Sequence, residues 1–193
     1  MAEKGDKTRQ FIVQTAEGLF SQKGFNAVTM KDICEACGLS RGGLYRHFGS
    51  TKEIFIEVLE RDENDAGASI DQAIALKLSA RKLMEGFFQL QKNDIAYNKN
   101  RIEVAVYEFS VSNPDQRDYL KRRFHSTVNI FAKLIGYGQA REEFMEGDPQ
   151  ALAEHIVIFL EGLKLSSKII EITEDFLDKQ FDILSRQIIK DGK

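Results

Sequence analysis

The sequence contains no tryptophan, only two prolines and no long apolar run. A helix that crosses a bilayer needs about 20 predominantly apolar residues, and no stretch of the chain approaches that length. The opening residues MAEKGDKTRQ are too polar for a secretory signal. Few prolines and long helical periodicities predict an all-α protein. The missing signal and the missing span predict a cytoplasmic protein without a membrane partner.

The usual constellations of enzyme chemistry are also missing. His47, His125 and His155 are scattered in the sequence, and the chain has neither a Ser-His-Asp order nor a Gly-rich phosphate loop before a helix. Cys34 and Cys37 form a C-x-x-C, but no βαβ pattern surrounds it and no second pair of zinc ligands lies near it. We therefore expect no catalytic residue, no metal and no cofactor. We interpret the cysteines as structural, with a thiol sensor as the alternative.

Charge is distributed unevenly along the chain. The formal net charge of −3 argues against a nonspecific nucleic-acid binder. Residues 1–52, however, hold eight Lys and Arg against five Asp and Glu, whereas the remaining residues hold 19 against 25. A basic N-terminal part on an acidic body favours localised contact with DNA.

The stretch Thr29–Lys52, TMKDICEACGLSRGGLYRHFGSTK, has the pattern of two short helices joined by a tight turn. Thr29 and Ser40 are suited to cap the starts of these helices. Gly38 can adopt the left-handed conformation that ends the first helix. The stretch predicts a helix-turn-helix, although short patterns of this kind also occur by chance in ordinary helical cores.

The second helix of this pair has two chemically different faces, at about 100° per residue. Leu44 and Phe48 form its inner face. A slim, cationic outer strip can approach base edges in a major groove, and donors beside it can reach phosphates. Two adjacent glycines cost helix stability, and close approach to DNA is a reason to retain them. The outer strip consists of Gly42, Gly43 and Arg46, and the flanking donors are Tyr45 and His47.

This segment resembles the DNA-binding region of the TetR/AcrR family of bacterial transcriptional regulators. The shared residues follow one another in the family's order. In the family, this region forms the second and third helices of the DNA-binding domain and the start of the fourth. The residues that carry the resemblance are Phe20, Gly24, Phe25, Thr29, Ile33, Gly38, Ser40, Gly42, Leu44, Tyr45, His47, Phe48 and Lys52.

The resemblance also implies which residues contact DNA. Base contacts come from the recognition helix, which here is Ser40–His47. The chain departs from the family at Lys52, which lies one residue later than usual, and at Gly43, where the family often has Thr, Ser or Ala. The implied phosphate contacts are Thr29, Tyr45, His47 and Lys52, and the other predicted DNA-binding residues are Ser40, Arg41, Gly42, Gly43 and Arg46.

Apolar periodicity predicts further helices along the chain. Asp6 is a candidate cap for the first helix, and residues 67–78 are compatible with either a helix or a loop. We predict about nine helices in two domains. Residues 1–52 form a three-helix helix-turn-helix DNA-binding domain, and residues 53–193 form a helical ligand-binding and dimerisation domain. The predicted helices outside the helix-turn-helix are residues 7–23, 51–66, 79–94, 102–110, 114–141 and 149–170, and a last helix that follows Thr173.

The helix predicted to start at Pro149 is apolar nearly all round in its middle, HIVIFLEGLKL. A helix of this kind must bury two faces, one in its own core and one against a partner chain, unless it is the central helix of a monomer. The segment GYGQAREEF, followed by Asp148 and Pro149, resembles the loop before helix eight of the family, whose helices eight and nine pair with their copies in a dimer. The predicted interface residues are Ile158, Phe159, Gly162, Leu165, Phe181 and Leu184.

Aromatic residues recur at helical spacing in the body of the chain. They fit a hydrophobic core, or a pocket for a small, mostly apolar ligand, which is the usual role of this domain in the family. No pattern in the sequence selects the ligand. The predicted ligand-binding residues are Phe87, Tyr107, Phe109, Phe124, Val128 and Phe131.

These features together predict a ligand-responsive transcriptional repressor. As a homodimer it would bind a pseudo-palindromic DNA operator, and a small effector would release it. Two alternatives stay open: an all-α enzyme that merely contains a helix-turn-helix-like turn, and an architectural protein that binds DNA without a ligand.

Overall fold

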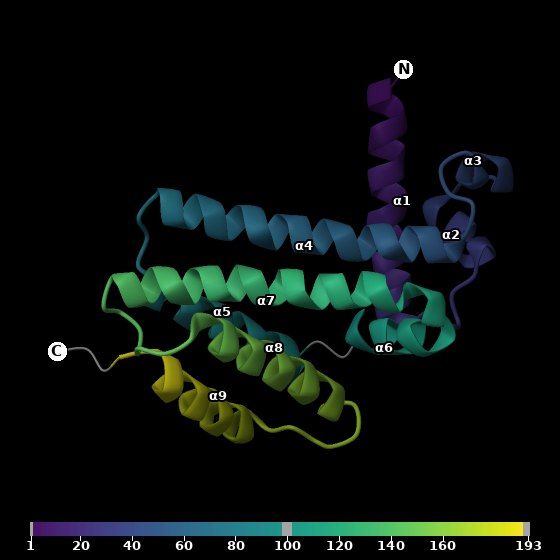
Figure 1. Ribbon diagram of the computed structural model, residues 1–193. Coiled ribbons are helices and arrows are strands. Elements are labelled where there is room, and N and C mark those ends of the chain that lie inside the picture. Colours follow the sequence, from purple (N-terminus) through teal and green to yellow (C-terminus); the bar gives the residue numbers. More distant parts are fainter. Residues whose placement is uncertain (1, 98–101, 191–193) are drawn as a thin grey trace. The chain divides into compact units, whose positions relative to one another are not determined.

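The protein is a bundle of α-helices in the computed structural model, which describes residues 2–97 and 102–190. This confirms the all-α prediction. None of the described helices is both long and apolar enough to cross a membrane. The elements in order are α1 (Ala2–Lys23), α2 (Met30–Cys37), α3 (Arg41–Tyr45), α4 (Thr51–Ala75), α5 (Ala80–Tyr97), α6 (Ile102–Ser112), the 3-10 turn η1 (Pro114–Gln116), α7 (Arg117–Ala140), α8 (Pro149–Ser166) and α9 (Glu174–Ile188) (Figure 1).

Several helix ends differ from the prediction. Helix α1 begins before Asp6, so the expectation that Asp6 caps it is wrong. Helix α4 continues to Ala75, which assigns most of the ambiguous residues 67–78 to a helix. Asn113 directly precedes Pro114 and is expected to cap the helix that begins there, but its side chain makes no capping hydrogen bond, and a 3-10 turn precedes α7. The last helix is expected to be capped by Thr173, and this is confirmed, because the Thr173 side chain accepts a hydrogen bond from Phe176 N.

The chain packs as two compact units, each built from two stretches of sequence. The N-terminal unit comprises Met1–Asn64 and Lys99–Leu120, and the C-terminal unit comprises Asp65–Asn98 and Lys121–Lys193. This division rests on packing, so α6 belongs with α1–α3. The predicted functional boundary at residue 52 stays a prediction.

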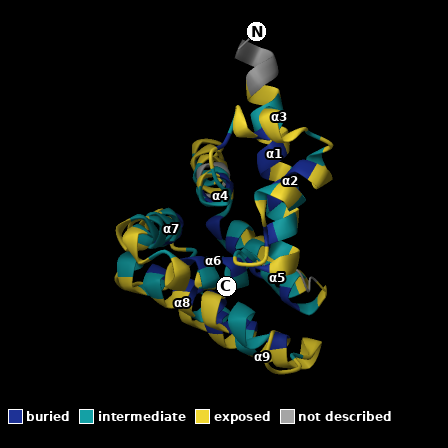
Figure 2. Cartoon of the chain, turned by 90° about the vertical axis from the view of Figure 1, so that its right-hand side faces the viewer, coloured by how far each residue is buried: buried dark blue, intermediate teal, exposed yellow. Residues whose placement is uncertain are grey.

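Four phenylalanine rings form the centre of the N-terminal unit. Phe55 of α4 packs edge-on against Phe20 of α1, with 4.8 Å between ring centroids. Phe109 of α6 lies 4.8 Å from Phe25 and 5.0 Å from Phe55. Figure 2 marks buried positions on the inner sides of these helices. Since aromatic pairs in such geometries add to the stability gained from burial, α6 is part of this core.

A glycine turn lets α6 approach the α1–α2 connection closely. Gly24 has a left-handed φ of 81°, and a Cβ atom there would lie 2.6 Å from Glu108 Oε2. The same carboxylate oxygen accepts a hydrogen bond of 3.0 Å from Asn26 N. The left-handed backbone conformation therefore favours glycine at position 24, and the absence of a side chain leaves room for the Glu108 carboxylate.

The segment between α7 and α8 anchors the C-terminal unit. Glu143 accepts hydrogen bonds from Arg81 N at 2.8 Å and from Ser79 Oγ and Arg141 Nε at 2.7 Å. Partial burial raises the pKa of Glu143, but these hydrogen bonds outweigh it and lower the pKa to about 2. The next residue, Phe144, packs directly on Gly138 of α7. The GYGQAREEF segment therefore has a structural role in fixing the start of α5.

Candidate nucleic-acid interface

Helix α2 is capped at both ends as the sequence predicts. Thr29 forms a capping box with Asp32, in which Asp32 N donates to Thr29 Oγ1 at 3.2 Å and Thr29 N donates to Asp32 Oδ2 at 2.9 Å. Hydrogen bonds from the Thr29 side chain and backbone lower the pKa of Asp32 to about 2. At the other end, Gly38 adopts a φ of 63°. Thr29 is therefore exposed with its hydroxyl already used as a cap.

Helix α3 is short and is oriented by its inner face. Gly43 N donates to Ser40 Oγ at 3.1 Å, which caps the start of the helix. Leu44 and Phe48 are fully buried in the N-terminal unit. Phe48 N still bonds the carbonyl of Leu44 at 3.1 Å, although α3 itself ends at Tyr45. Of the recognition helix predicted at residues 40–47, only residues 41–45 form an α-helix, about one and a half turns long. A hydrogen-bonded turn follows at residues 46 and 47.

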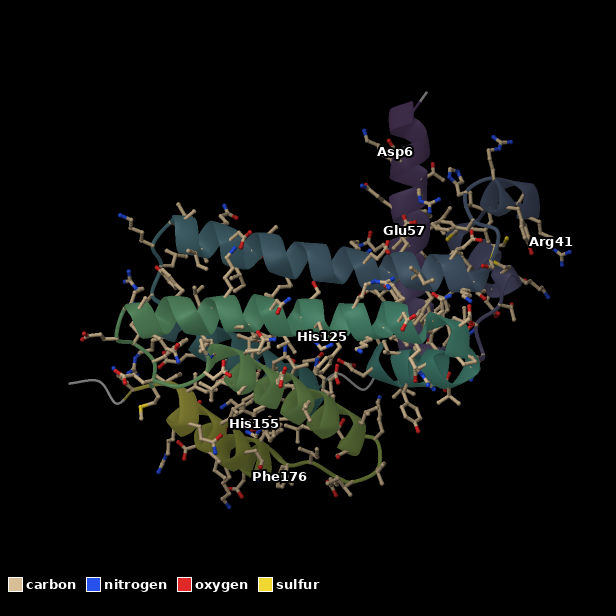
Figure 3. The ribbon with its side chains drawn as sticks, viewed as in Figure 1. Asp6, Arg41, Glu57, His125, His155 and Phe176 are labelled. Carbon is tan, nitrogen blue, oxygen red and sulfur yellow. The ribbon has the colours of Figure 1, made fainter. Side chains whose placement is uncertain are left out.

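The outer face of α3 carries the predicted DNA contacts. Tyr45 is 53% exposed, and Arg41 extends away from α3 in Figure 3. A Cβ atom at Gly42 would meet nothing within 4 Å, whereas one at Gly43 would lie 3.3 Å from Ser40 Oγ. Packing within the described chain therefore gives no reason for glycine at position 42. The exposed predicted residues are Thr29, Ser40, Arg41, Gly42, Tyr45 and Arg46, and the half-buried ones are Gly43, His47 and Lys52.

Lys52, at the start of α4, has a carboxylate partner. Its Nζ lies 2.5 Å from Asp115 Oδ2 in η1, and the hydrogen bond from Lys52 lowers the pKa of Asp115. The start of α4 is also capped locally, since Glu53 N donates to Ser50 Oγ at 3.2 Å and Gly49 N donates to Glu53 Oε2 at 2.8 Å. A phosphate at Lys52 would therefore have to compete with Asp115.

Comparison with known proteins agrees with this geometry. A family profile described as bacterial regulatory proteins of the tetR family matches residues 12–58, and one described as a tetracyclin repressor-like C-terminal domain matches residues 83–178. The chain belongs to the TetR family. It is thus a DNA-binding transcriptional regulator of the helix-turn-helix type.

Individual TetR-family relatives align over most of the chain. YfiR of Bacillus subtilis, an uncharacterized HTH-type transcriptional regulator, is 30% identical over 156 residues, which cover 77% of this chain and 74% of YfiR. The nucleoid occlusion factor SlmA of Actinobacillus pleuropneumoniae is 29% identical over 180 residues, covering 84% and 82%. A transcriptional regulator from Saccharomonospora viridis, solved in complex with choline, has the same fold with a TM-score of 0.75 and 23% identity, covering 96% and 100%.

The two cysteines of this TetR-family chain lie in the helix-turn-helix. Cys34 is buried and Cys37 is half-buried, and neither forms a disulfide bond among the described residues. Burial raises the pKa of Cys37. A raised pKa disfavours the reactive thiolate, which supports the structural interpretation of this pair.

The predicted ligand-binding residues do not form one group. Phe87 of α5 and Phe131 of α7 pack edge-on, 5.0 Å apart, in the C-terminal unit. Phe109 is fully buried in the core of the N-terminal unit, and Tyr107 is 62% exposed on α6 of the same unit. The other two predicted residues, Phe124 and Val128, are on α7 in the C-terminal unit, half-buried and fully buried respectively.

The predicted dimer residues divide between the surface and the core. Ile158 is 60% exposed on α8, and Gly162 is exposed one helical turn further along. Phe181 and Leu184 are only 2% exposed, because they pack in the core of the C-terminal unit. These two residues cannot contact a partner directly in this conformation. Of the remaining predicted residues, Phe159 and Leu165 are half-buried.

Sequence reasoning missed residues at both surfaces. Arg9 donates a hydrogen bond to the backbone just after α3, at a residue 38 positions away in the sequence. Asp115 accepts a hydrogen bond from Lys52, which is 63 positions away. Periodicity carries no signal for such distant pairs. On α9, Phe176 and Ile183 are exposed and seven residues apart. Their spacing of two helical turns was a usable signal for a shared outer face.

Proposed function

We propose that this regulator is a ligand-responsive repressor that acts by binding, without catalysis, as a cytoplasmic homodimer on a pseudo-palindromic operator. The observation that carries the proposal is the outer face of α3. It presents Arg46 and the open position Gly42 to solvent while Leu44 and Phe48 hold the helix from behind. Two such helices can enter successive major grooves if the dimer holds them about 34 Å apart.

The proposed dimer face lies on α8 and α9. His155, Ile158 and Gly162 are exposed on one side of α8, and Phe176 and Ile183 are exposed on one side of α9. Figure 3 labels His155 and Phe176 on these helices. An apolar strip at the surface favours contact with a second protein chain. Gly162 permits close approach of the partner helix because it has no side chain.

The proposed effector site lies between α5 and α7 in the C-terminal unit. Phe87, Phe124 and Phe131 supply an apolar lining. Among the described residues, Gln91 Oε1 and Arg123 Nε are buried polar atoms without a hydrogen-bond partner. Buried polar groups are normally paired. We therefore infer an effector that is mostly apolar but offers one acceptor to Arg123 and one donor to Gln91.

The response to the effector requires coupling between the two sites. Residues of α4 belong to both units, and Lys52 stands at the start of this helix. An effector that binds one arrangement of the dimer more tightly shifts the population toward it. The coupling must be reciprocal, so operator binding weakens effector binding by the same factor, typically about 5- to 150-fold.

Operator release by small molecules tests the proposal. The purified protein is first used to select duplexes from a random-sequence pool, and compounds are then screened for release of the selected duplex. We expect a symmetric selected sequence and at least one releasing compound. Arg123→Met and Gln91→Leu should reduce the response to that compound while the protein still binds the duplex. An unchanged response in both variants would contradict the effector site.

The similarity to SlmA favours a second candidate function. In this alternative the chain is an architectural protein that binds DNA without release by a small effector. The same experiment separates the two functions. Selection of one symmetric sequence with a releasing compound supports the repressor, and tight binding that no compound releases supports the second function.

A further inference from the structure

The side chain of Arg9 connects three helices of the N-terminal unit. From α1 its Nε donates to Glu57 Oε1 of α4 at 2.9 Å, and its Nη2 forms an ion pair with Glu57 Oε2. Its Nη1 donates to the carbonyl oxygen of His47 at 2.6 Å. The guanidinium carbon lies 4.0 Å from the centroid of the Phe48 ring. Figure 3 labels Glu57 on α4, beside α1.

Helix α3 needs such support because it is too short to hold its own geometry. It has five residues, and isolated helices shorter than about 12 residues are marginal in water. The last carbonyl groups of any helix lack intrahelical partners. A cationic donor near them is favourable, because it meets the negative end of the helix dipole. Arg9 supplies this donor at the backbone carbonyl of His47, which is itself one of the proposed DNA contacts.

The planar guanidinium is needed for this arrangement. Two nitrogens face the Glu57 carboxylate while a third faces the His47 carbonyl and the plane covers Phe48. A lysine ammonium cannot reproduce a two-nitrogen fork together with stacking. Glu57 accordingly orients the Arg9 side chain, and Arg9 in turn holds the end of α3 in place.

We propose that Arg9 is a positioning residue for operator binding. It sets the orientation of Tyr45 and His47 by fastening the end of α3 to α1 and α4, and Glu57 holds Arg9 in place. This inference rests on the proposed operator surface of α3. A residue that acts only on the stability of the unit would lower thermal stability without a separate effect on DNA affinity.

A second ion pair between the same two helices provides a matched control. Arg61 of α4 pairs with Glu17 of α1, with side chains about as exposed as those of Arg9 and Glu57. The guanidinium of Arg9 also donates to the backbone carbonyl of His47, just after α3, whereas Arg61 forms an ion pair with the Glu17 carboxylate on α1. Loss of either ion pair should therefore affect stability to a similar extent, and loss of Arg9 should additionally affect operator binding.

The test compares Arg9→Lys, Glu57→Gln and Arg61→Lys in the full-length protein. Affinity is measured for the duplex that the wild type selects from a random-sequence pool, together with thermal unfolding and amide exchange of Leu44 and Phe48. We expect Arg9→Lys and Glu57→Gln to weaken binding about tenfold more than Arg61→Lys, within the range of coupling between residues in contact. Their α3 amides should also exchange faster than those of the control.

Glu57→Gln separates positioning from simple electrostatics. The substitution removes a negative charge close to the DNA surface, so charge alone would tighten binding, whereas positioning predicts weaker binding. Tighter binding by Glu57→Gln, or equal losses in Arg9→Lys and Arg61→Lys, would overturn the role of Arg9. If Tyr45→Phe and His47→Ala leave affinity unchanged, the operator surface itself is wrong, and the inference falls with it.

Discussion

The outer face of α3 and the outer face of α8 and α9 are both exposed, but their chemistry is opposite. The first carries Tyr45 and Arg46 around the open position Gly42. The second carries Ile158 and Ile183, which are 60% and 54% exposed. A small, cationic face suits a polyanion with a groove, whereas an apolar face suits another protein surface. In each case the outward residues lie outside the core behind them, which supports the proposal that each face contacts something outside the chain.

The largest expected effect that distinguishes the two faces comes from a charge placed at Gly162 on α8. A Cβ atom there meets nothing within 4 Å, so Gly162→Arg should leave the monomer folded and weaken dimerisation by about 2 kcal/mol or more, as expected for a central interface position. Operator affinity should fall with it. Sedimentation at micromolar concentration measures the effect.

Gly86 of α5 offers a control for this substitution. It is also exposed and helical, and a Cβ atom there meets nothing within 4 Å. Gly86→Arg should keep the dimer intact. A wild type that sediments as a 22.0 kDa monomer would contradict the assignment of the α8–α9 face.

The second prediction distinguishes base contacts from phosphate contacts on α3. Arg46→Ala should lose about 1–3 kcal/mol of discrimination at particular base pairs. Tyr45→Phe should weaken binding to all sequences alike, because phosphate contacts carry no base information. Competition with single-base variants of the selected duplex measures both. A uniform loss in Arg46→Ala would show that Arg46 does not face the groove.

The third prediction concerns Gly42, where one substitution should have opposite effects on protein stability and operator affinity. Gly42→Ala should raise the free energy of unfolding by up to about 1 kcal/mol, because alanine favours a helix and its Cβ meets nothing in the chain. Operator affinity should fall, because the added methyl group lies on the face that approaches DNA. Urea unfolding and DNA titration measure the two effects. Unchanged affinity would place DNA away from Gly42.

The smallest expected effect concerns the partner of Lys52. Asp115→Asn removes the carboxylate that holds Lys52 Nζ, so Lys52 should reach a phosphate more readily and operator affinity should rise by a few tenths to 1 kcal/mol, the range for exposed ion pairs. Lys52→Met should lower the salt slope of binding by about 1. An unchanged salt slope of binding in Lys52→Met would show that Lys52 does not contact a phosphate.

The caps and buried positions around α3 could be predicted from the sequence more fully than the side of α9 that faces the core, for a physical reason. The caps at Thr29 and Ser40 and the inner pair Leu44 and Phe48 are set by neighbours within a few residues. Which side of α9 faces outward depends instead on packing against distant helices. Thus Phe181 entered the core against Phe88 of α5, although its type and spacing also fitted an interface.

Long-range polar contacts were the least predictable part of the site. Neither the pairing of Lys52 with Asp115 nor the contact of Arg9 with the His47 carbonyl follows from local propensity. Both depend on how separate helices meet in the N-terminal unit. The same limit applies to Phe109, whose aromatic character and spacing fitted a ligand pocket and whose partners Phe25 and Phe55 lie far away in sequence.

Phe109 also constrains the order in which the protein can be built on the ribosome. Domains generally fold as units during synthesis, beginning from the N-terminus. The helix-turn-helix emerges early, but its core stays incomplete until α6 brings Phe109 against Phe25 and Phe55. Until α6 has left the ribosome, these two rings lack the third ring that packs against them. A fragment that stops before α6 would carry the whole recognition helix and still lack the ring that closes its core.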